Sequence, residues 1–132
     1  MNITAKILMG GMEIEARDKM IDEFRKNGFH VLISTNVLAR GIDVPEVDIV
    51  INFDVPMIIV HGFRDPDYAN FMHRVGRTGR FGTDGIAVSL MKDEDEEELM
   101  RLIAKHYEIE IPDLKSFDHL VKTLTEMRGQ GL

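Results

Sequence analysis

The chain alternates short apolar runs with amphipathic segments, and this alternation limits the folds available to it more than any other feature. Four short runs are mostly apolar: Ala5–Met9, His30–Ser34, Val47–Phe53 and Gly85–Met91. Strands of this kind are buried on both faces, as in parallel sheets covered by helices. The pattern therefore predicts an α/β fold with a mainly parallel sheet.

Amphipathic segments separate or follow these runs. Glu13–Lys26 carries Ile14, Ile21 and Phe24 near helical spacing, with acids early and bases late, and Asn27-Gly28 ends it. A second helix begins at the capping pattern of Asp93 with Glu96. Its expected inward residues are Leu99, Leu102, Ile103 and Tyr107. A last helix is capped by Ser116, with these residues expected inward: Phe117, Leu120, Val121 and Leu124.

Two segments stand outside this pattern. The acidic run Asp93–Glu98 is interpreted as the solvated start of a helix, in preference to an acidic recognition patch. The segment Pro56–Asp67 contains two prolines and an exposed-looking apolar stretch, Met57–Val60. We expect it to form a long loop.

Composition excludes several classes of protein. The 132 residues include no cysteine, so disulfides and thiol chemistry are excluded, and the five histidines lack ligand spacing, so no metal site is expected. There is no apolar run of membrane-spanning length and no signal-peptide pattern, which favours an intracellular protein. The net charge of −7 argues against a uniformly basic nucleic-acid binder. Between Thr35 and Gly82, however, there are arginines but no lysines. A local cationic site is therefore compatible with the acidic net charge.

The segment TNVLARGID follows the second apolar run directly. Thr35 and Asn36 offer a hydroxyl and an amide suited to phosphate oxygens, Gly41 permits close backbone approach, and Asp43 could accept from a ribose hydroxyl. A capped turn with an ion pair between Arg40 and Asp43 explains the same residues equally well.

The segment HRVGRTGRFG gathers three of the nine arginines within seven residues. A helix reaching Val75 would end at Gly76, and Arg77 and Arg80 would then project from irregular chain. Arginine's planar fork matches phosphate oxygens, so this pattern suits charge stabilisation in phosphoryl transfer. The alternative is pairing with the protein's own acids. Because ligands bind at the carboxyl ends of parallel strands, we expect the segments after Ser34, after Phe53 and around His73–Gly82 at one edge.

TNVLARGID and HRVGRTGRFG resemble motifs V and VI of DEAD-box RNA helicases. VINFDVP resembles the strand and turn between them, and GGMEIEARDKMIDEFR resembles motif IVa. The resemblance runs from about Lys6 to Tyr107 and implies the second, C-terminal RecA-like domain, a three-layer αβα fold. The insert before the motif VI helix resembles the insert of the family branch that acts in mRNA export at the nuclear pore. Membership of that branch implies nuclear-pore and activator proteins as partners. It also implies a location in cytoplasm and nucleus.

The resemblance also implies roles for individual residues. Arg77 and Arg80 match arginine fingers on the γ-phosphate of ATP, and Gly41 and Asp43 match further ATP contacts. The residues that match positions coupling the two domains are Arg40, His73 and Arg74. The residues that match contacts to the RNA backbone are Gly10, Gly11, Arg17, Thr35 and Asn36. This sequence departs from the family at Ile14, where glutamine is frequent.

Other family parts are absent from these residues. There is no GxxxxGK[ST] and no Asp-Glu-Ala-Asp, so ATP and its magnesium ion would be held mainly by a first domain. We expect residues 1–132 to form a C-terminal helicase domain lacking its first strand and helix. A bare sheet edge would then favour self-association or low stability. Alone, the chain is expected to be inactive. The alternative is a non-catalytic docking module using the acidic helix start and Met57–Val60; a DNA helicase is a third option.

Overall fold

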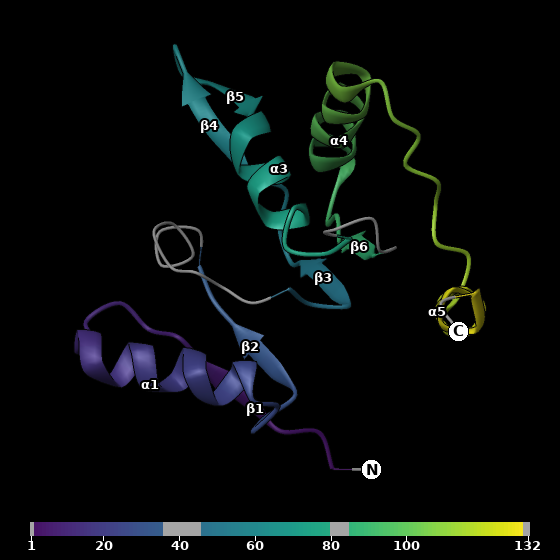
Figure 1. Cartoon of the computed structure of the whole chain (residues 1–132). Helices are drawn as coiled ribbons and strands as arrows, with labels where there is room; N and C mark the ends of the chain where they lie inside the picture. Colours follow the sequence, from purple (N-terminus) through teal and green to yellow (C-terminus); the bar gives the residue numbers. More distant parts are fainter. Residues whose placement is uncertain (1, 36–45, 80–84, 131–132) are drawn as a thin grey trace. The chain divides into compact units, whose positions relative to one another are not determined.

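The computed structural model describes residues 2–35, 46–79 and 85–130. The chain divides into two compact units, Met1–Pro45 and Glu46–Leu132, each described here by itself (Figure 1). The elements in chain order are β1 (Ala5–Ile7), α1 (Ile14–Arg25), β2 (Val31–Ile33), β3 (Ile49–Asn52), β4 (Met57–Val60), β5 (Phe63–Pro66), α3 (Tyr68–Val75), β6 (Ile86–Ser89), α4 (Glu94–Tyr107) and α5 (Phe117–Gln130).

The first unit is a strand–helix–strand segment. Strands β1 and β2 pair in parallel, with Ala5 opposite Val31 and Ile7 opposite Ile33. Helix α1 connects them and ends where Asn27 adopts a left-handed φ of 60°. The parallel pairing, the helix and its end at Asn27-Gly28 confirm the sequence prediction.

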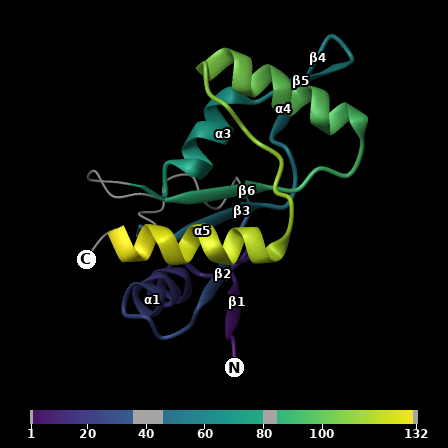
Figure 2. The ribbon, with the colours of Figure 1, turned by 90° about the vertical axis from the view of Figure 1, so that its right-hand side faces the viewer.

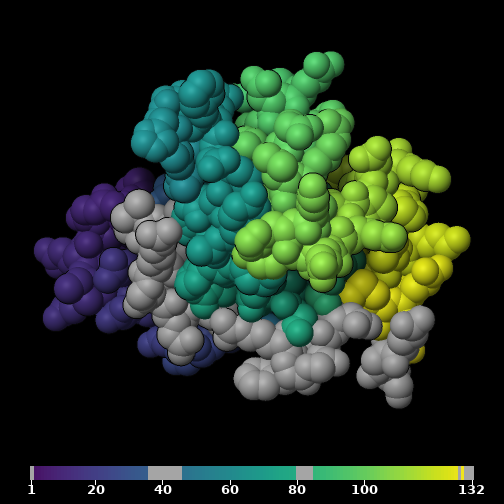
Figure 3. All heavy atoms as spheres, turned by 90° about the horizontal axis from the view of Figure 1, so that it is seen from above, coloured from purple at the N-terminus to yellow at the C-terminus, as the bar shows by residue number. Residues whose placement is uncertain are grey.

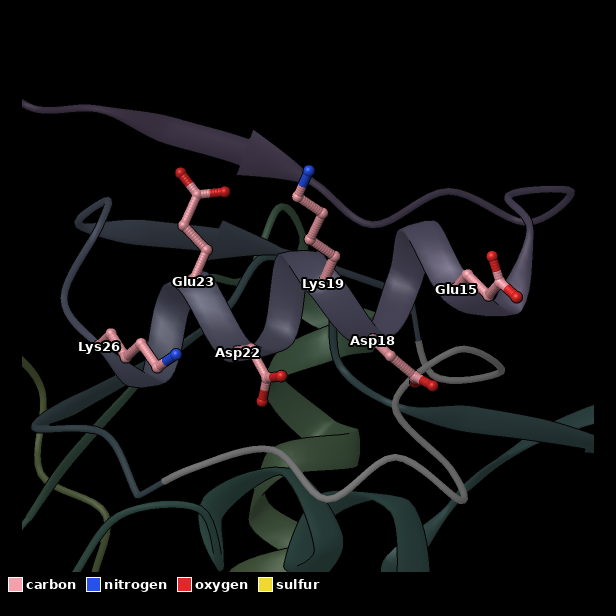
Figure 4. Close-up of a pocket in the computed structure, with 6 residues that line it drawn as sticks. All are labelled: Glu15, Asp18, Lys19, Asp22, Glu23 and Lys26. Carbon is pink, nitrogen blue, oxygen red and sulfur yellow. The ribbon is translucent and has the colours of Figure 1, made fainter.

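The core of this unit is small. Its buried apolar side chains are Leu8, Ile21 and Phe29. Lys6 Nζ lies 2.8 Å from a Glu23 carboxylate oxygen and ties β1 to α1. In Figure 4 the Glu23 side chain points to the β1 side of α1.

One face of the β1–β2 pair remains exposed among the described residues. Ile7, Val31 and Ile33 alternate with Lys6 and Leu32 along the strands, and Lys6 faces α1 through Glu23. Side chains of alternate strand residues point to opposite faces. The three apolar side chains retain 41–55% of their surface exposed. This unit therefore presents an apolar sheet surface.

The second unit is built on another parallel pair. Strands β3 and β6 are in register from Ile49 opposite Ile86 to Asn52 opposite Ser89. Helix α3 packs on this pair, and α4 packs against α3 and β5 on the same side (Figure 2). The buried cluster that joins them consists of Val55, Phe71, Leu99, Met100 and Ile103.

The predicted long loop over Pro56–Asp67 is wrong, because the chain forms an antiparallel hairpin there. Strand β4 pairs with β5, with Met57 opposite Pro66 and Val60 opposite Phe63. The two turn residues, His61 and Gly62, have φ values of 50° and 81°. Positive φ at both central residues is the requirement of a type I′ hairpin turn, whose twist matches the strands. Strand β5 contacts α4, and hairpin and helix lie side by side in Figure 3.

Strand β4 and the first residue of β5 give the hairpin an exposed apolar surface. All four residues of β4 are exposed, and Phe63 retains 78% of its surface. The expectation of an exposed apolar stretch at Met57–Val60 is thus confirmed, although in a strand.

Helices α4 and α5 begin as predicted but bury fewer residues than expected. Asp93 accepts a hydrogen bond from Glu96 N at 3.0 Å, while the Glu96 carboxylate accepts from Lys92 N at 2.7 Å. The acids of Asp93–Glu98 are exposed except Glu96, so the run is a solvated helix start.

Three side chains expected inward are exposed. On α4, Leu99 and Ile103 are buried, but Leu102 retains 36% exposure. On α5, Ser116 Oγ accepts from His119 N at 3.1 Å. Phe117 and Val121 nevertheless retain 80% and 54% exposure, because nothing described covers that stripe of the helix. None of the described helices combines the length and apolar character that a membrane crossing requires.

Candidate functional site

The predicted arginine segment begins on helix α3. Asp67 caps the helix and accepts from Asn70 N at 3.1 Å. The last helical residue is Val75, and Gly76 forms the C-cap. The helix therefore ends where the sequence predicted, and Arg77 follows outside it.

Arg74 is anchored to the chain that follows β3. Its Nη1 donates to the Asp54 carbonyl oxygen at 2.9 Å and to Asp54 Oδ1 at 3.0 Å. The same nitrogen lies 3.4 Å from Asn52 Oδ1. The Arg74 side chain is only 16% exposed, whereas that of Asp54 is 71% exposed. The last turn of α3 is thus tied to the carboxyl end of β3.

Arg77 lies against His73, one turn earlier. Arg77 Nη2 is 2.6 Å from His73 Nε2. Because a guanidinium can only donate, His73 Nε2 acts as the acceptor and the ring proton must sit on Nδ1. Two predicted site residues, His73 and Arg77, are therefore in direct contact.

The main chain after α3 runs toward the amino end of β3. Val47 N donates to the Arg77 carbonyl oxygen at 2.9 Å, and Thr78 Oγ1 donates to the Asp48 carbonyl oxygen at 3.0 Å. Val47 and Asp48 precede β3. We expected the arginine segment to lie at the carboxyl ends of the strands. Arg74 does lie there, beside Asp54, but the main chain of Arg77 and Thr78 lies at the amino end of β3. The reason is that α3 runs back along β3.

Two glycines let this segment pack closely. Gly79 has a φ of 71°, a conformation that costs other residues about 1–2 kcal/mol. A Cβ at Gly85 would lie 2.1 Å from Thr78 Oγ1 and 2.5 Å from Gly79 N. No side chain fits at Gly85 without displacing the arginine segment, so glycine there holds the segment against the start of β6.

In the first unit, several residues predicted to contact RNA share one end of the parallel pair. Gly10 and Gly11 follow β1, and Thr35 follows β2. Arg17 lies in the first half of α1, and its Nε is buried without a hydrogen-bond partner in the described structure. A buried unpaired donor is unfavourable by about 1–3 kcal/mol, which leaves a hydrogen bond for a ligand to supply.

Five predicted site residues lie outside the described residues: Asn36, Arg40, Gly41, Asp43 and Arg80. Sequence reasoning missed the anchoring residues Asn52 and Asp54. The sequence did mark Asn52 as unusual, because asparagine is unfavourable in a strand that is otherwise apolar.

A separate hollow lies on α1 and holds none of the predicted site residues. Its lining is Glu15, Asp18, Lys19, Asp22, Glu23 and Lys26 (Figure 4). These six side chains are the alternating acids and lysines of one solvent-exposed helix face, so the hollow is the space between them. Within the described ranges there is no group of three or more acidic or histidine side chains arranged to hold a metal ion.

Comparison with known proteins decides the family. The model of the helicase conserved C-terminal domain matches residues 1–82, more than half of the chain. The chain belongs to the helicase C-terminal domain family. This match ends in the arginine segment and includes α1, β1 to β5 and α3.

More similar proteins narrow this to DEAD-box helicases of the Dbp5 branch. The chain is 41% identical over 136 aligned residues to the ATP-dependent RNA helicase dbp5 of Aspergillus clavatus, with 97% of the chain and 28% of that protein covered. It resembles the solved C-terminal domain of Dbp5 with a TM-score of 0.80 and 38% identity, over 94% of this chain and 69% of that one.

A Saccharomyces cerevisiae Dbp5 structure bound to RNA and ADP BeF3 also matches at a TM-score of 0.80, with 38% identity over 94% of this chain and 32% of that one. These neighbours confirm the RecA-like α/β fold and the DEAD-box resemblance. The chain spans less than a third of the length of the Aspergillus clavatus relative.

Proposed function

We propose that this chain acts as the C-terminal half of an ATP-dependent DEAD-box RNA helicase, in mRNA export and remodelling. The observation that carries the proposal is the arrangement at the end of α3. Arg74 is paired with Asp54, and Arg77 follows on irregular chain with its guanidinium in contact with the His73 ring. The end of a fixed helix therefore presents a guanidinium where a phosphate oxygen could bind.

Arg77 and Arg80 would act as arginine fingers. In the transition state of phosphoryl transfer, negative charge spreads over the oxygens of the transferred group, and a positioned guanidinium stabilises it. An incoming γ-phosphate offers Arg77 a negatively charged acceptor in place of His73 Nε2, and a guanidinium can bind phosphate oxygens with two parallel hydrogen bonds. His73, Arg74 and Arg40 would then link nucleotide binding to contact with the first domain.

The donors at this site fit a nucleotide phosphate. Guanidinium nitrogens bind anions and repel cations, so they suit ATP oxygens and are unsuited to magnesium. We assign Gly41 and Asp43 to the nucleotide as well, and magnesium mainly to the first domain. ATP supplies the bond whose hydrolysis drives closure and opening of the two domains.

The chain would bind RNA through the sugar–phosphate backbone of the RNA. We assign these contacts to Gly10, Gly11, Arg17, Thr35 and Asn36. Gly10, Gly11 and Thr35 share one end of the β1–β2 pair, and the unpaired Nε of Arg17 is a donor suited to a phosphate oxygen. Such contacts are independent of base sequence.

The relatives support a proposal for partners and location. Saccharomyces cerevisiae Dbp5 has been solved with Gle1 and IP6, and with Nup159. We assign to this chain an intracellular location in cytoplasm and nucleus, including the nuclear pore, and partners of the same activator and pore classes. The exposed Ile7, Val31 and Ile33 support self-association through the β1–β2 face.

The test supplies the first domain in trans. An N-terminal RecA-like domain of a Dbp5 relative is mixed with this chain, and ATP hydrolysis is measured with and without RNA. RNA-stimulated hydrolysis is expected only in the mixture, and Arg77→Ala and Arg80→Ala should each lower it on the order of 10³-fold, to a residual rate that can still be measured. Arg64→Ala, an exposed arginine on β5, is the matched control and should retain activity.

The second candidate is the docking module, favoured by the exposed apolar strand β4 (Met57–Val60) and the acidic start of α4. It predicts that neither Arg77→Ala nor Arg80→Ala changes the mixture's activity. Activity of the 132-residue chain without the first domain would contradict both candidates.

A further inference from the structure

Asn52 is an unusual residue for its position. It occupies the last position of β3, and only 2% of its surface is exposed. Asparagine is depleted in strands, and a buried amide is costly unless its hydrogen bonds are formed. The isoleucines and valine that precede it in the same strand suit the position better. A requirement other than strand stability is therefore needed to account for the amide.

The amide is held on both sides by specific partners. Asn52 Nδ2 donates to Ser89 Oγ at 3.2 Å, across the parallel register that places these two residues opposite each other. On its other side, Asn52 Oδ1 faces Arg74 Nη1 at 3.4 Å. The serine hydroxyl therefore determines which way the amide faces and leaves the oxygen for the guanidinium.

Two of the side chains that contact Arg74, those of Asn52 and Asp54, differ in how firmly they can hold it. The Asp54 carboxylate is largely exposed, so water and salt screen its attraction for Arg74. Asn52 is buried, belongs to a strand and is braced by a second strand. The exposed carboxylate provides charge, whereas the buried amide provides a rigid reference point for the guanidinium.

The position of Arg74 is passed to Arg77 through one turn of chain. Arg77 N donates to the Arg74 carbonyl oxygen at 3.3 Å. Arg77's own side chain rests on His73, the neighbour of Arg74. A change in where Arg74 sits therefore moves both supports of the proposed finger.

We propose that Asn52, oriented by Ser89, is a positioning residue for ATP hydrolysis: it sets Arg74 and through it aims Arg77. This rests on the proposed function, in which Arg77 is an arginine finger. Asn52 and Ser89 touch neither nucleotide nor RNA in this proposal. Their loss should therefore lower kcat for ATP and leave KM for ATP nearly unchanged.

The variants separate the two partners. Ser89→Ala removes one hydroxyl and frees the amide to turn, while Ser89→Thr keeps the hydroxyl. Asn52→Leu keeps the size and removes both hydrogen bonds. Val55→Ala is the control, because Val55 is 3% exposed, lies three residues from Asn52 and has an apolar side chain that belongs to the buried cluster.

Kinetics are measured in the two-domain mixture with saturating RNA, and melting temperatures are measured in parallel. Ser89→Ala and Asn52→Leu should lower kcat by about 10-fold to 100-fold, the range that misplacing a reacting group by up to an ångström produces. Ser89→Thr should restore most of kcat. Val55→Ala should lower the melting temperature without lowering kcat.

A double-mutant cycle identifies the path. In an Arg77→Ala background, Ser89→Ala should cause no further loss, since the finger it aims is gone. An equal further loss there, or an unchanged kcat in Ser89→Ala alone, overturns the positioning role. If Arg77→Ala itself has no effect, the proposed function fails instead. Should Asn52→Leu fail to fold, Ser89→Ala and Ser89→Thr decide the question.

Discussion

The buried cluster beneath the arginine segment can be tested with two adjacent residues of α4. Ile103 is fully buried, and Leu102 retains 36% exposure. Both side chains have four carbons beyond Cα, so Ile103→Ala and Leu102→Ala delete the same number of atoms. Burial is the main difference between them.

The expected magnitudes follow from that difference. Removing three buried carbons from Ile103 loses about 2.4 kcal/mol of transfer free energy at about 0.8 kcal/mol per carbon. The cavity that remains brings the loss to about 3 kcal/mol, within the range of about 2–5 for such changes. Leu102→Ala should lose about 1 kcal/mol, because its side chain is partly in water and alanine favours the helix.

Urea unfolding followed by far-UV circular dichroism measures both free energies of unfolding. The difference of about 2 kcal/mol should appear as a lower midpoint for Ile103→Ala with an unchanged slope. Equal midpoints, or a larger loss for Leu102→Ala, would show that α4 does not pack as described and would remove the base on which α3 rests.

Three further predictions concern caps, turns and tautomers. Asp93→Ala should lower the free energy of unfolding by about 1 kcal/mol, because it removes the acceptor for Glu96 N, while Asp93→Asn should restore most of it in the same urea titration. Gly79→Ala should be destabilising by about 1–2 kcal/mol because of its φ of 71°, and a neutral result by thermal melting would contradict the turn. The neutral His73 ring should carry its proton on Nδ1, as the contact with Arg77 requires, and imidazole ¹⁵N chemical shifts showing an Nε2 proton would refute that contact.

Features that depend on local chemistry were predictable from the sequence. The helix starts at Asp93 and Ser116 and the helix end at Gly76 were placed correctly, since each depends on residues within one turn. The parallel pairs were predictable from runs of apolar residues. The arginine segment was recognisable because its residue types and spacing have few other uses.

Features that depend on distant partners were not predictable. The prolines of Pro56–Asp67 indicated a loop, yet Pro66 is the last residue of β5 and lies opposite Met57, at the end of the hairpin away from the turn. Helical spacing grouped Phe117 with Leu120 but could not show whether anything covers them. The anchors of Arg74 come from 20 and 22 residues away, which spacing along the sequence cannot reveal.

The central claim is that Arg77 stabilises the transferred phosphate through the fork geometry of its guanidinium. The most direct test is Arg77→Lys in the two-domain mixture, which keeps the positive charge and removes the fork. RNA-stimulated kcat should fall on the order of 10³-fold, the contribution expected of an arginine finger, with KM for ATP changed far less. A lysine variant that hydrolyses ATP at the wild-type rate would contradict the claim.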